Sequence, residues 1–216
     1  TVTAVENLKR EGIREGVHLV GDVMYDSILY FEKKSTFKTD ILSKLNLNKK
    51  GLNQRYILAT IHRQENTYSI ENLSSILNAM SEIKEEIILP LHPRTKKTIK
   101  EEKLSYKKNI KIIEPVSYLE MLSLEKNASM ILTDSGGIQK EAFMLAVPCI
   151  TLREETEWLE TVESGMNKLV GSSTERILKA YNEFSLNDVK TLPDHSNCYG
   201  DGNAAQKIVE ILSRSL

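Results

Sequence analysis

The chain has little of what marks metal-binding, membrane-spanning or nucleic-acid-binding proteins. Its two cysteines, Cys149 and Cys198, lie outside any metal-ligand spacing, and a reducing cytoplasm suits a chain with so few thiols. No apolar run approaches the roughly 20 residues of a membrane span. The formal net charge of -1 gives no global basic field that would collect nucleic acid or anionic lipid. We therefore expect a cytoplasmic protein without metal, membrane or nucleic-acid partners, in which any phosphate binding is local.

A regular alternation of short apolar runs and helical stretches is present instead. The runs are apolar throughout, which indicates strands buried on both faces of a parallel sheet. Their alternation with helices is the doubly wound, Rossmann-like α/β pattern. The expected strands are 17–20, 56–60, 87–91, 110–113, 130–132, 149–152 and 169–170. The expected helices are 24–31, 69–83, a polar one after Pro93, 118–124, 138–145, 157–163, 174–184 and 204–216.

Polar or turn residues follow five of these strands closely. They are His62, His92, the pair Pro115-Val116, Ser135 and Arg153. In open α/β sheets, ligands bind outside the carboxyl ends of the strands. All five would therefore lie along one edge of one sheet, and this convergence predicts a nucleotide cleft there.

The most informative segment is 130–142, Met-Ile-Leu-Thr-Asp-Ser-Gly-Gly-Ile-Gln-Lys-Glu-Ala. An apolar strand breaks into the turn Ser135-Gly136-Gly137 and then into a helix, so backbone N–H groups at a helix N-terminus are open to an anion. Glu141, one turn inside the helix, could accept hydrogen bonds from two ribose hydroxyls. A nucleoside diphosphate would satisfy both features, although an ordinary strand–helix connection explains the segment as well when it is taken alone.

Two histidines at strand ends are candidates for ligand contact. His62 could donate to phosphate oxygens or move protons near neutral pH, and the alternative is a surface histidine held by Glu65. His92 precedes Pro93, which favours an extended conformation, and a turn role is as well supported as a ligand contact.

Two polar stretches are expected to serve folding. Asn66 and Thr67 are placed to cap the helix that begins near residue 69. The loop residues 200–202 supply turn chemistry before the last helix, and either Asp201 or Asn203 is expected to cap it.

Four further stretches accompany the segment 130–142. They are 59–66 (Ala-Thr-Ile-His-Arg-Gln-Glu-Asn), 91–93 (Leu-His-Pro), 153–158 (Arg-Glu-Glu-Thr-Glu-Trp) and 199–202 (Tyr-Gly-Asp-Gly). Together they closely resemble the non-hydrolysing UDP-N-acetylglucosamine 2-epimerases. The resemblance runs over the whole chain but covers only the C-terminal part of such an enzyme. Since the first residues also read as a helix from mid-protein, we expect a fragment from which the N-terminal catalytic domain is absent.

The resemblance implies a two-domain fold like that of the B-type glycosyltransferases, with residues 1–216 as the UDP-binding domain and about 203–216 as a crossover helix. It implies interconversion of UDP-N-acetylglucosamine and UDP-N-acetylmannosamine by elimination and re-addition of UDP, without a cofactor, usually for surface polysaccharide. The family's acid/base carboxylates and Gly-Thr-Arg-Pro loop lie in the N-terminal domain. The chain alone is therefore expected to bind UDP weakly and to be inactive, and the implied partners are a UDP-sugar, its own N-terminal domain and, in the full enzyme, a second copy.

The resemblance also assigns roles to single residues. His62 matches an active-site histidine and is the candidate catalytic residue. His92 matches a histidine near a second sugar-nucleotide site in substrate-activated members, but those usually continue Leu-Asn-Pro where this chain has Pro-Arg-Thr. Trp158 stands where many members have an arginine that touches the nucleotide, so that contact is not carried over. The candidate substrate-binding residues are Val116 and Met121 against the uracil edge, with His92, Ser135, Gly136, Gly137, Glu141 and Glu157.

Two other classes of function remain open. The nucleotide domain of a retaining glycosyltransferase would use a similar glycine-rich turn and ribose carboxylate. A non-catalytic sugar-nucleotide-binding module would bind a UDP-sugar without needing His62. Neither class accounts for all five stretches.

Overall fold

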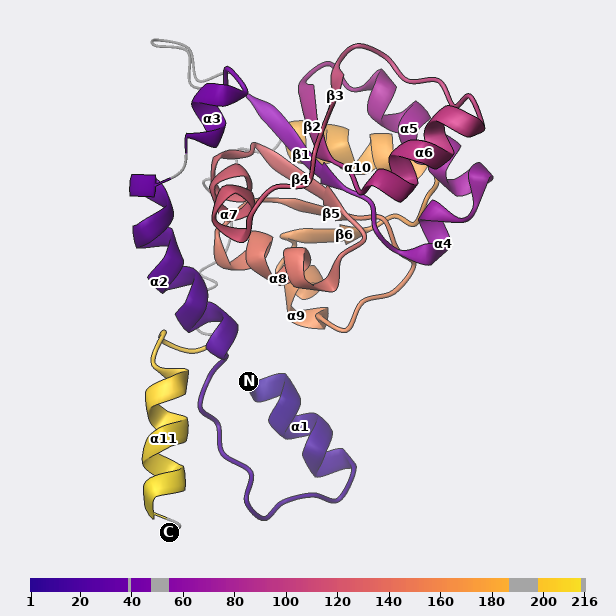
Figure 1. Cartoon of the computed structure of the whole chain (residues 1–216). Helices are drawn as coiled ribbons and strands as arrows, with labels where there is room; N and C mark the ends of the chain where they lie inside the picture. The colour runs from indigo at the N-terminus through magenta and orange to yellow at the C-terminus, as the bar shows by residue number, and fades with distance from the viewer. Residues whose placement is uncertain (39, 48–54, 187–197, 215–216) are drawn as a thin grey trace. The chain divides into compact units, whose positions relative to one another are not determined.

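The structure, a computed structural model, describes residues 1–38, 40–47, 55–186 and 198–214 (Figure 1). The chain divides into two compact units. The larger unit is Thr39–Leu192, and the smaller one combines Thr1–Lys38 with Pro193–Leu216. No helix in these ranges is long and apolar enough to cross a membrane.

The larger unit is built on a six-stranded sheet in which every pairing is parallel. The strand order is β3-β2-β1-β4-β5-β6. The chain therefore moves outward from β1 to β3 and then returns to place β4 beside β1, which makes the β1/β4 boundary the switch point of the sheet. This confirms the predicted doubly wound parallel sheet. The strands are β1 Tyr56–Thr60, β2 Glu86–Pro90, β3 Ile110–Ile113, β4 Met130–Thr133, β5 Cys149–Thr151 and β6 Asn167–Leu169.

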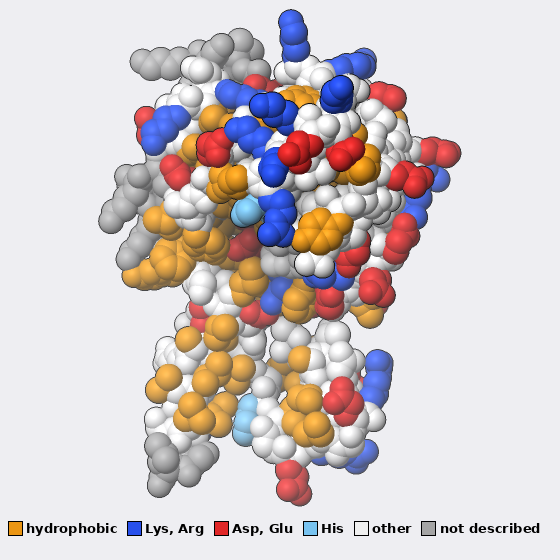
Figure 2. All heavy atoms as spheres, turned by 45° about the vertical axis from the view of Figure 1, so that its right-hand side comes forward, with side chains coloured by type: hydrophobic (Ala, Val, Ile, Leu, Met, Phe, Trp, Pro, Cys, Tyr) orange, Lys and Arg blue, Asp and Glu red, His pale blue; other side chains and the backbone are white. Residues whose placement is uncertain are grey.

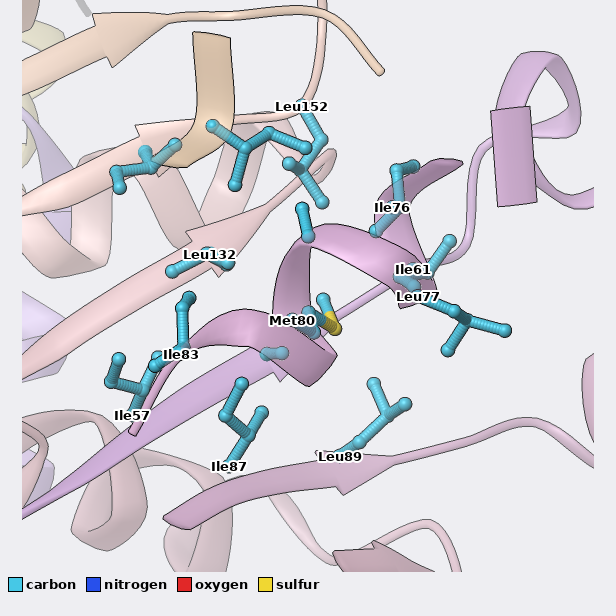
Figure 3. Close-up of a cluster of buried hydrophobic side chains, with 14 of the residues drawn as sticks. Ile57, Ile61, Ile76, Leu77, Met80, Ile83, Ile87, Leu89, Leu132 and Leu152 are labelled. Atoms are coloured by element: carbon cyan, nitrogen blue, oxygen red, sulfur yellow. The ribbon is translucent and has the colours of Figure 1, made fainter. Parts of the chain in front are cut away.

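Helices cover both faces of this sheet, so the central strands β1, β4 and β5 are buried on two sides, while the edge strands β3 and β6 are mostly half-buried. Side chains alternate along a strand: Ile57 and Ala59 of β1 enter one core cluster, and Tyr56 and Leu58 enter the other. The first cluster, part of which is seen in Figure 3, lies under α5 Ile70–Glu82, α6 Pro93–Glu101 and α10 Thr174–Leu186. The second lies under α3 Ile41–Lys44, α7 Tyr118–Asn127 and α8 Gly136–Met144. Each fully buried leucine or isoleucine contributes about 1.5–3 kcal/mol.

Serine side chains accept from first-turn amides in four of these helices: Ser69 in α5, Ser117 in α7, Ser135 in α8 and Ser173 in α10. Ser69 accepts from Asn72 N at 3.2 Å, and Ser117 forms a capping box with Glu120 at the start of α7. The expectation that Asn66 and Thr67 cap α5 is therefore wrong. Both lie inside a separate short helix, α4 Gln64–Thr67, because Asn66 is drawn into a buried polar contact described below.

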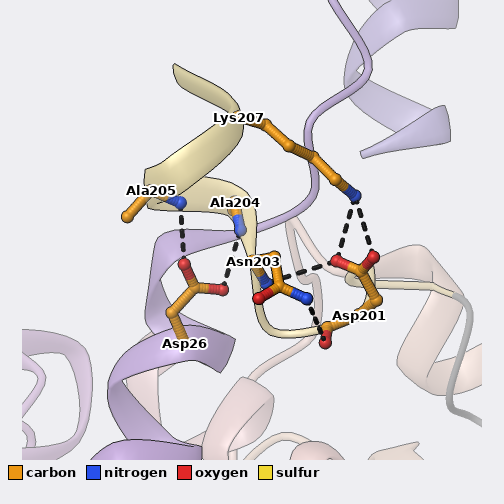
Figure 4. A network of polar contacts seen from close by, with 6 residues as sticks. All are labelled: Asp26, Asp201, Asn203, Ala204, Ala205 and Lys207. Atoms are coloured by element: carbon orange, nitrogen blue, oxygen red, sulfur yellow. Dashed lines mark hydrogen bonds and ion pairs between the residues drawn. The ribbon is translucent and has the colours of Figure 1, made fainter. Parts of the chain in front are cut away.

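The smaller unit contains α1 Val2–Arg10, α2 Val23–Lys38 and α11 Ala204–Arg214. The first amides of α11 donate to a carboxylate of α2: Ala204 N and Ala205 N lie 3.1 and 2.7 Å from the Asp26 oxygens (Figure 4). Asn203 stands at the predicted N-cap position, since its carbonyl accepts from Lys207 N at 3.1 Å, but the side chain that accepts from the first amides is that of Asp26. The prediction is wrong for Asp201. Asp201 is engaged instead by Lys207 at 3.0 Å and by Asn203 N at 3.2 Å.

The expected strand at 17–20 is absent from the described structure. This segment lies between Gly16 and Gly21, which have φ values of 69° and 100°, and it pairs with no described strand. It belongs to the smaller unit, where Asp22 N donates to Tyr199 O at 2.9 Å. A Cβ on Gly21 would lie 3.1 Å from Tyr199 O, so a close backbone approach requires glycine there. The prediction relied on the apolar run alone, and it is wrong because a strand also needs a neighbouring strand to pair with.

Candidate nucleotide site

The carboxyl edge of the sheet brings the predicted strand-end residues onto one side of the larger unit. Strands β1 and β4 are neighbours in register, with Thr60 opposite Thr133. The hydroxyls of these two threonines are hydrogen-bonded at 2.6 Å, and Thr133 Oγ1 also accepts from Ser135 N at 2.9 Å. His62 and Ser135 therefore leave the same edge of the sheet, as the sequence predicted, and the strand order places them side by side at its switch point.

The N-terminus of α8 is open to an anion. Ser135 is the N-cap and accepts from Ile138 N at 3.4 Å. Among the described residues, none accepts a hydrogen bond from the amides of Gly136 or Gly137. These N–H groups lie at the positive end of the helix dipole, which is where phosphate oxygens bind in many α/β proteins.

Space around Gly136 is restricted by the loop that follows β5. A Cβ on Gly136 would lie 3.3 Å from Trp158 Nε1 and 3.7 Å from Glu157 Oε2. The Trp158 Nε1 atom is buried, and no described residue accepts its hydrogen. Lys140 Nζ lies 4.3 Å from the centre of the Trp158 ring, a cation–π contact that holds the indole against α8.

Asp134, which the sequence analysis passed over, connects the two turns at the switch point. Its carboxylate is 0 % exposed. It accepts from His62 N at 2.9 and 3.1 Å, from Arg63 N at 3.0 Å and from Asn66 Nδ2 at 3.0 Å. Asn66 Nδ2 also donates to Leu152 O at 3.1 Å. Three donors compensate the buried charge and fix the backbone that carries His62.

His62 and His92 line one pocket of about 390 Å³, together with Gln64, Thr67, Tyr68, Arg94 and Thr95. The His62 side chain is exposed, and no described residue, Glu65 included, makes a hydrogen bond or ion pair with its ring. The alternative that Glu65 holds His62 is therefore not what the structure shows. His92 has a structural role: it is the N-cap of α6, and its Nδ1 accepts from Arg94 N at 3.2 Å.

The basic residues after Pro93 form an exposed face of α6. Figure 2 shows lysine and arginine side chains gathered on one part of the molecule and interspersed with acidic ones. Lys96 pairs with Glu114 at 2.6 Å, and Lys97 pairs with Glu101 at 3.6 Å. This is a solvated, partly neutralised helix face rather than an extended cationic surface.

Glu141 does not project into open solvent, because α7 covers it. It is 7 % exposed. The hydroxyl of Tyr118 is hydrogen-bonded to its carboxyl, and Glu125 lies beside it. Burial raises the pKa of Glu141, and burial together with the neighbouring Glu141 raises the pKa of Tyr118 to about 12.

Val116 and Met121 are half-buried and pack against the second core cluster. The Met121 N–H is already used in the first turn of α7, where it donates to Ser117 O at 2.8 Å. This N–H is therefore not available to a base.

Arg153 and Glu157 form a bidentate pair beside Gly136. Arg153 Nη1 and Nη2 lie 3.0 and 2.9 Å from the two Glu157 oxygens. The hydrogen bonds from Arg153 lower the pKa of Glu157 to about 2, so this carboxylate is charged at neutral pH. Thr156 ties the loop to α8 by donating to Gln139 Oε1 at 2.7 Å. Within the described ranges, no group of three His, Cys, Asp or Glu side chains is arranged to hold a metal ion.

A doubly wound parallel sheet with an open helix N-terminus at its switch point defines a Rossmann-like α/β domain of the class that binds nucleotides. The family model described as UDP-N-acetylglucosamine 2-epimerase matches residues 1–213. The chain belongs to that family.

Two relatives that the chain matches over almost its whole length are also named as 2-epimerases or their homologs. The chain is 51% identical to a UDP-N-acetylglucosamine 2-epimerase homolog of Methanococcus maripaludis, over 98% of this chain and 58% of the relative. It is 41% identical to the UDP-2,3-diacetamido-2,3-dideoxy-D-glucuronate 2-epimerase of Pseudomonas aeruginosa, over 99% of this chain and 58% of the relative. The chain thus spans less than two thirds of their length.

A solved structure of a 2-epimerase has the same fold. The UDP-GlcNAc 2-epimerase of Methanocaldococcus jannaschii, in complex with UDP-GlcNAc and UDP, superposes with a TM-score of 0.85 at 43% identity. The match covers 99% of this chain and 59% of that structure.

Proposed function

We propose that the chain is the UDP-binding part of a UDP-N-acetylglucosamine 2-epimerase, an isomerase. The diphosphate binds at Ser135, Gly136 and Gly137, and Glu141 accepts from the ribose hydroxyls. The observation that carries this proposal is the pair of unused amides at the N-terminus of α8, at the switch point of the sheet. A relative with the same fold was solved in complex with UDP-GlcNAc and UDP, which supports the same ligand class here.

The reaction assigned to this site removes the proton from C2 of the sugar and breaks the C1–O bond, which gives a glycal and UDP. Re-addition of UDP to C1, with a proton delivered to the other face of C2, inverts that carbon. Negative charge grows on the diphosphate as the C1–O bond breaks, and the open amides of α8 stabilise it. His62, held at the switch point through its backbone, donates to a phosphate oxygen or moves a proton.

The remaining partners belong to the same proposal. Residues 1–216 act with an N-terminal catalytic domain of the longer enzyme, which supplies the acid/base carboxylates, and residues 203–216 cross back to it. The full enzyme is a cytoplasmic homodimer, in keeping with two cysteines that are both free. Val116 and Met121 contact the uracil, His92 contacts the sugar or its phosphates, and the charged Glu157 contacts the sugar.

Calorimetric titration with UDP tests the proposal directly. We expect weak but measurable binding to this chain, and Glu141→Ala weakens it more than about tenfold, as the loss of hydrogen bonds to a charged group predicts. Glu101→Ala is the matched control, because Glu101 is exposed on α6. Unchanged affinity in Glu141→Ala would remove Glu141 from the ribose role.

A sugar-interconversion assay tests the division of labour. The chain alone should not interconvert UDP-N-acetylglucosamine and UDP-N-acetylmannosamine, and the chain joined to a family N-terminal domain should. Turnover by the isolated chain would contradict the proposed arrangement.

A further inference from the structure

Two buried carboxyl groups lie together behind the proposed ribose site. Glu125 of α7 is 1 % exposed, and Glu141 of α8 is 7 % exposed. No described N–H or O–H group donates to either oxygen of Glu125. The Glu141 carboxyl interacts with that of Glu125, and the Tyr118 hydroxyl contacts Glu141 as well.

Ionising both carboxyls in such a place is costly, since each raises the cost of charging the other, so one of them keeps its proton to a higher pH. Burial, followed by the neighbouring Glu141, raises the pKa of Glu125 well above the ordinary glutamate value. A hydrogen bond between two carboxyl groups also requires that one of them keep a proton. The pair therefore keeps one proton to a pH above that at which an ordinary glutamate is ionised.

Among the described residues, no cation stabilises the charged form of either carboxyl in place of this proton. From β1, the Tyr56 hydroxyl donates to Leu124 O at 2.6 Å, and burial followed by Glu125 raises its pKa. From β5, burial raises the pKa of the Cys149 thiol. The hydrogen bond with Thr151 opposes this rise, and the nearby Glu125 adds to it. No lysine, arginine or histidine of the described chain lowers the pKa of either carboxyl.

We propose that Glu125 is a positioning residue. It keeps this proton and donates a hydrogen bond to Glu141, so that an ionised Glu141 is held in one orientation toward the ribose hydroxyls. The inference rests on the proposed role of Glu141. Tyr118 holds the same carboxyl from α7, and the two contacts together leave Glu141 little rotational freedom. Loss of the shared proton would remove the donor and place two charges in contact. UDP binding therefore weakens as the pH rises through the titration of the pair.

The direction of the pH effect follows from the raised pKa values. Both carboxyls are protonated below the raised pKa of Glu141, and Glu141 is then a poor acceptor. Above that pKa one proton remains on the pair, and binding is strongest. Binding falls again when this last proton leaves at higher pH.

The test is calorimetric titration with UDP of the unsubstituted chain and of Glu125→Gln, from about pH 5 to about pH 9. Glutamine keeps an N–H donor for Glu141 and does not titrate. We expect the affinity of the unsubstituted chain to fall at least about threefold more than that of Glu125→Gln as the pair loses its last proton, and the infrared band of the protonated carboxyl, followed over the same pH series, marks where that loss occurs. The terminal phosphate of UDP titrates in both proteins, so the comparison removes its effect. Parallel pH profiles would overturn the proposal.

A second readout does not depend on UDP. The infrared spectrum of the unsubstituted chain at neutral pH should contain the carbonyl band of a buried protonated carboxyl, and Glu125→Gln should lack it. Without this band in the unsubstituted chain the inference fails, even if Glu125→Gln does not fold. If the band is present but Glu141→Ala binds UDP normally, the ribose assignment fails while the proton-sharing pair stands.

Discussion

Replacing Asp134 by asparagine should loosen the turn that carries His62. The carboxylate serves three donors, and Oδ2 alone takes Arg63 N and Asn66 Nδ2 at 3.0 Å each. An asparagine keeps one acceptor oxygen and places an NH2 group opposite at least one donor. One buried donor then loses its acceptor, which costs about 1–3 kcal/mol, and the remaining bonds lose the strength that the charge provides, about 1 kcal/mol each.

Asparagine is neutral, so the substitution also removes the cost of burying a charge. With that gain subtracted, the expected loss of unfolding free energy is about 2–4 kcal/mol. Urea unfolding followed by circular dichroism measures this loss. Asp40→Asn is the control, since Asp40 is exposed and makes no side-chain cap bond, and it should change stability by less than about 0.5 kcal/mol. If Asp134→Asn also changed the unfolding free energy by less than about 0.5 kcal/mol, Asp134 would not hold the two turns together.

Two further substitutions separate binding from folding. Gly136→Ala places a methyl group 3.3 Å from Trp158 Nε1 at the N-terminus of α8, so UDP binding measured by calorimetry should fall at least about tenfold. Thermal stability should change little, because alanine is a better helix former than glycine. An undiminished affinity would exclude a phosphate from this position. Asp26→Ala removes the acceptor for Ala204 N and Ala205 N and should cost about 0.5–2 kcal/mol, with faster hydrogen exchange at those two amides. Unaltered exchange would show that the cap is not Asp26.

The sheet could be predicted because its signal is local. The run at 56–60 is apolar at each position, and both faces of β1 are buried, so pattern and environment agree. The Ser135-Gly136-Gly137 turn was found for the same reason, because strand, glycines and helix are consecutive. The run at 17–20 carries a similar local pattern, yet no described strand lies beside it.

The contacts that shape the site depend on residues far apart in sequence. Asp134 is satisfied by donors 68 to 72 positions away, and Asp26 caps a helix that begins 178 positions later. Glu125 follows apolar residues within a helix, and nothing local links it to Glu141. The only sequence signal for Asp134 is its position between a buried strand and a glycine turn, where a charged residue requires donors from elsewhere.

The central claim is that a diphosphate binds to the open amides of α8. A crystal structure of the chain with UDP tests it most directly. The account predicts phosphate oxygens within hydrogen-bond distance of Gly136 N and Gly137 N, and the ribose hydroxyls on Glu141. UDP bound at any other place, or those two amides engaged by the protein's own groups while UDP is bound, would contradict it.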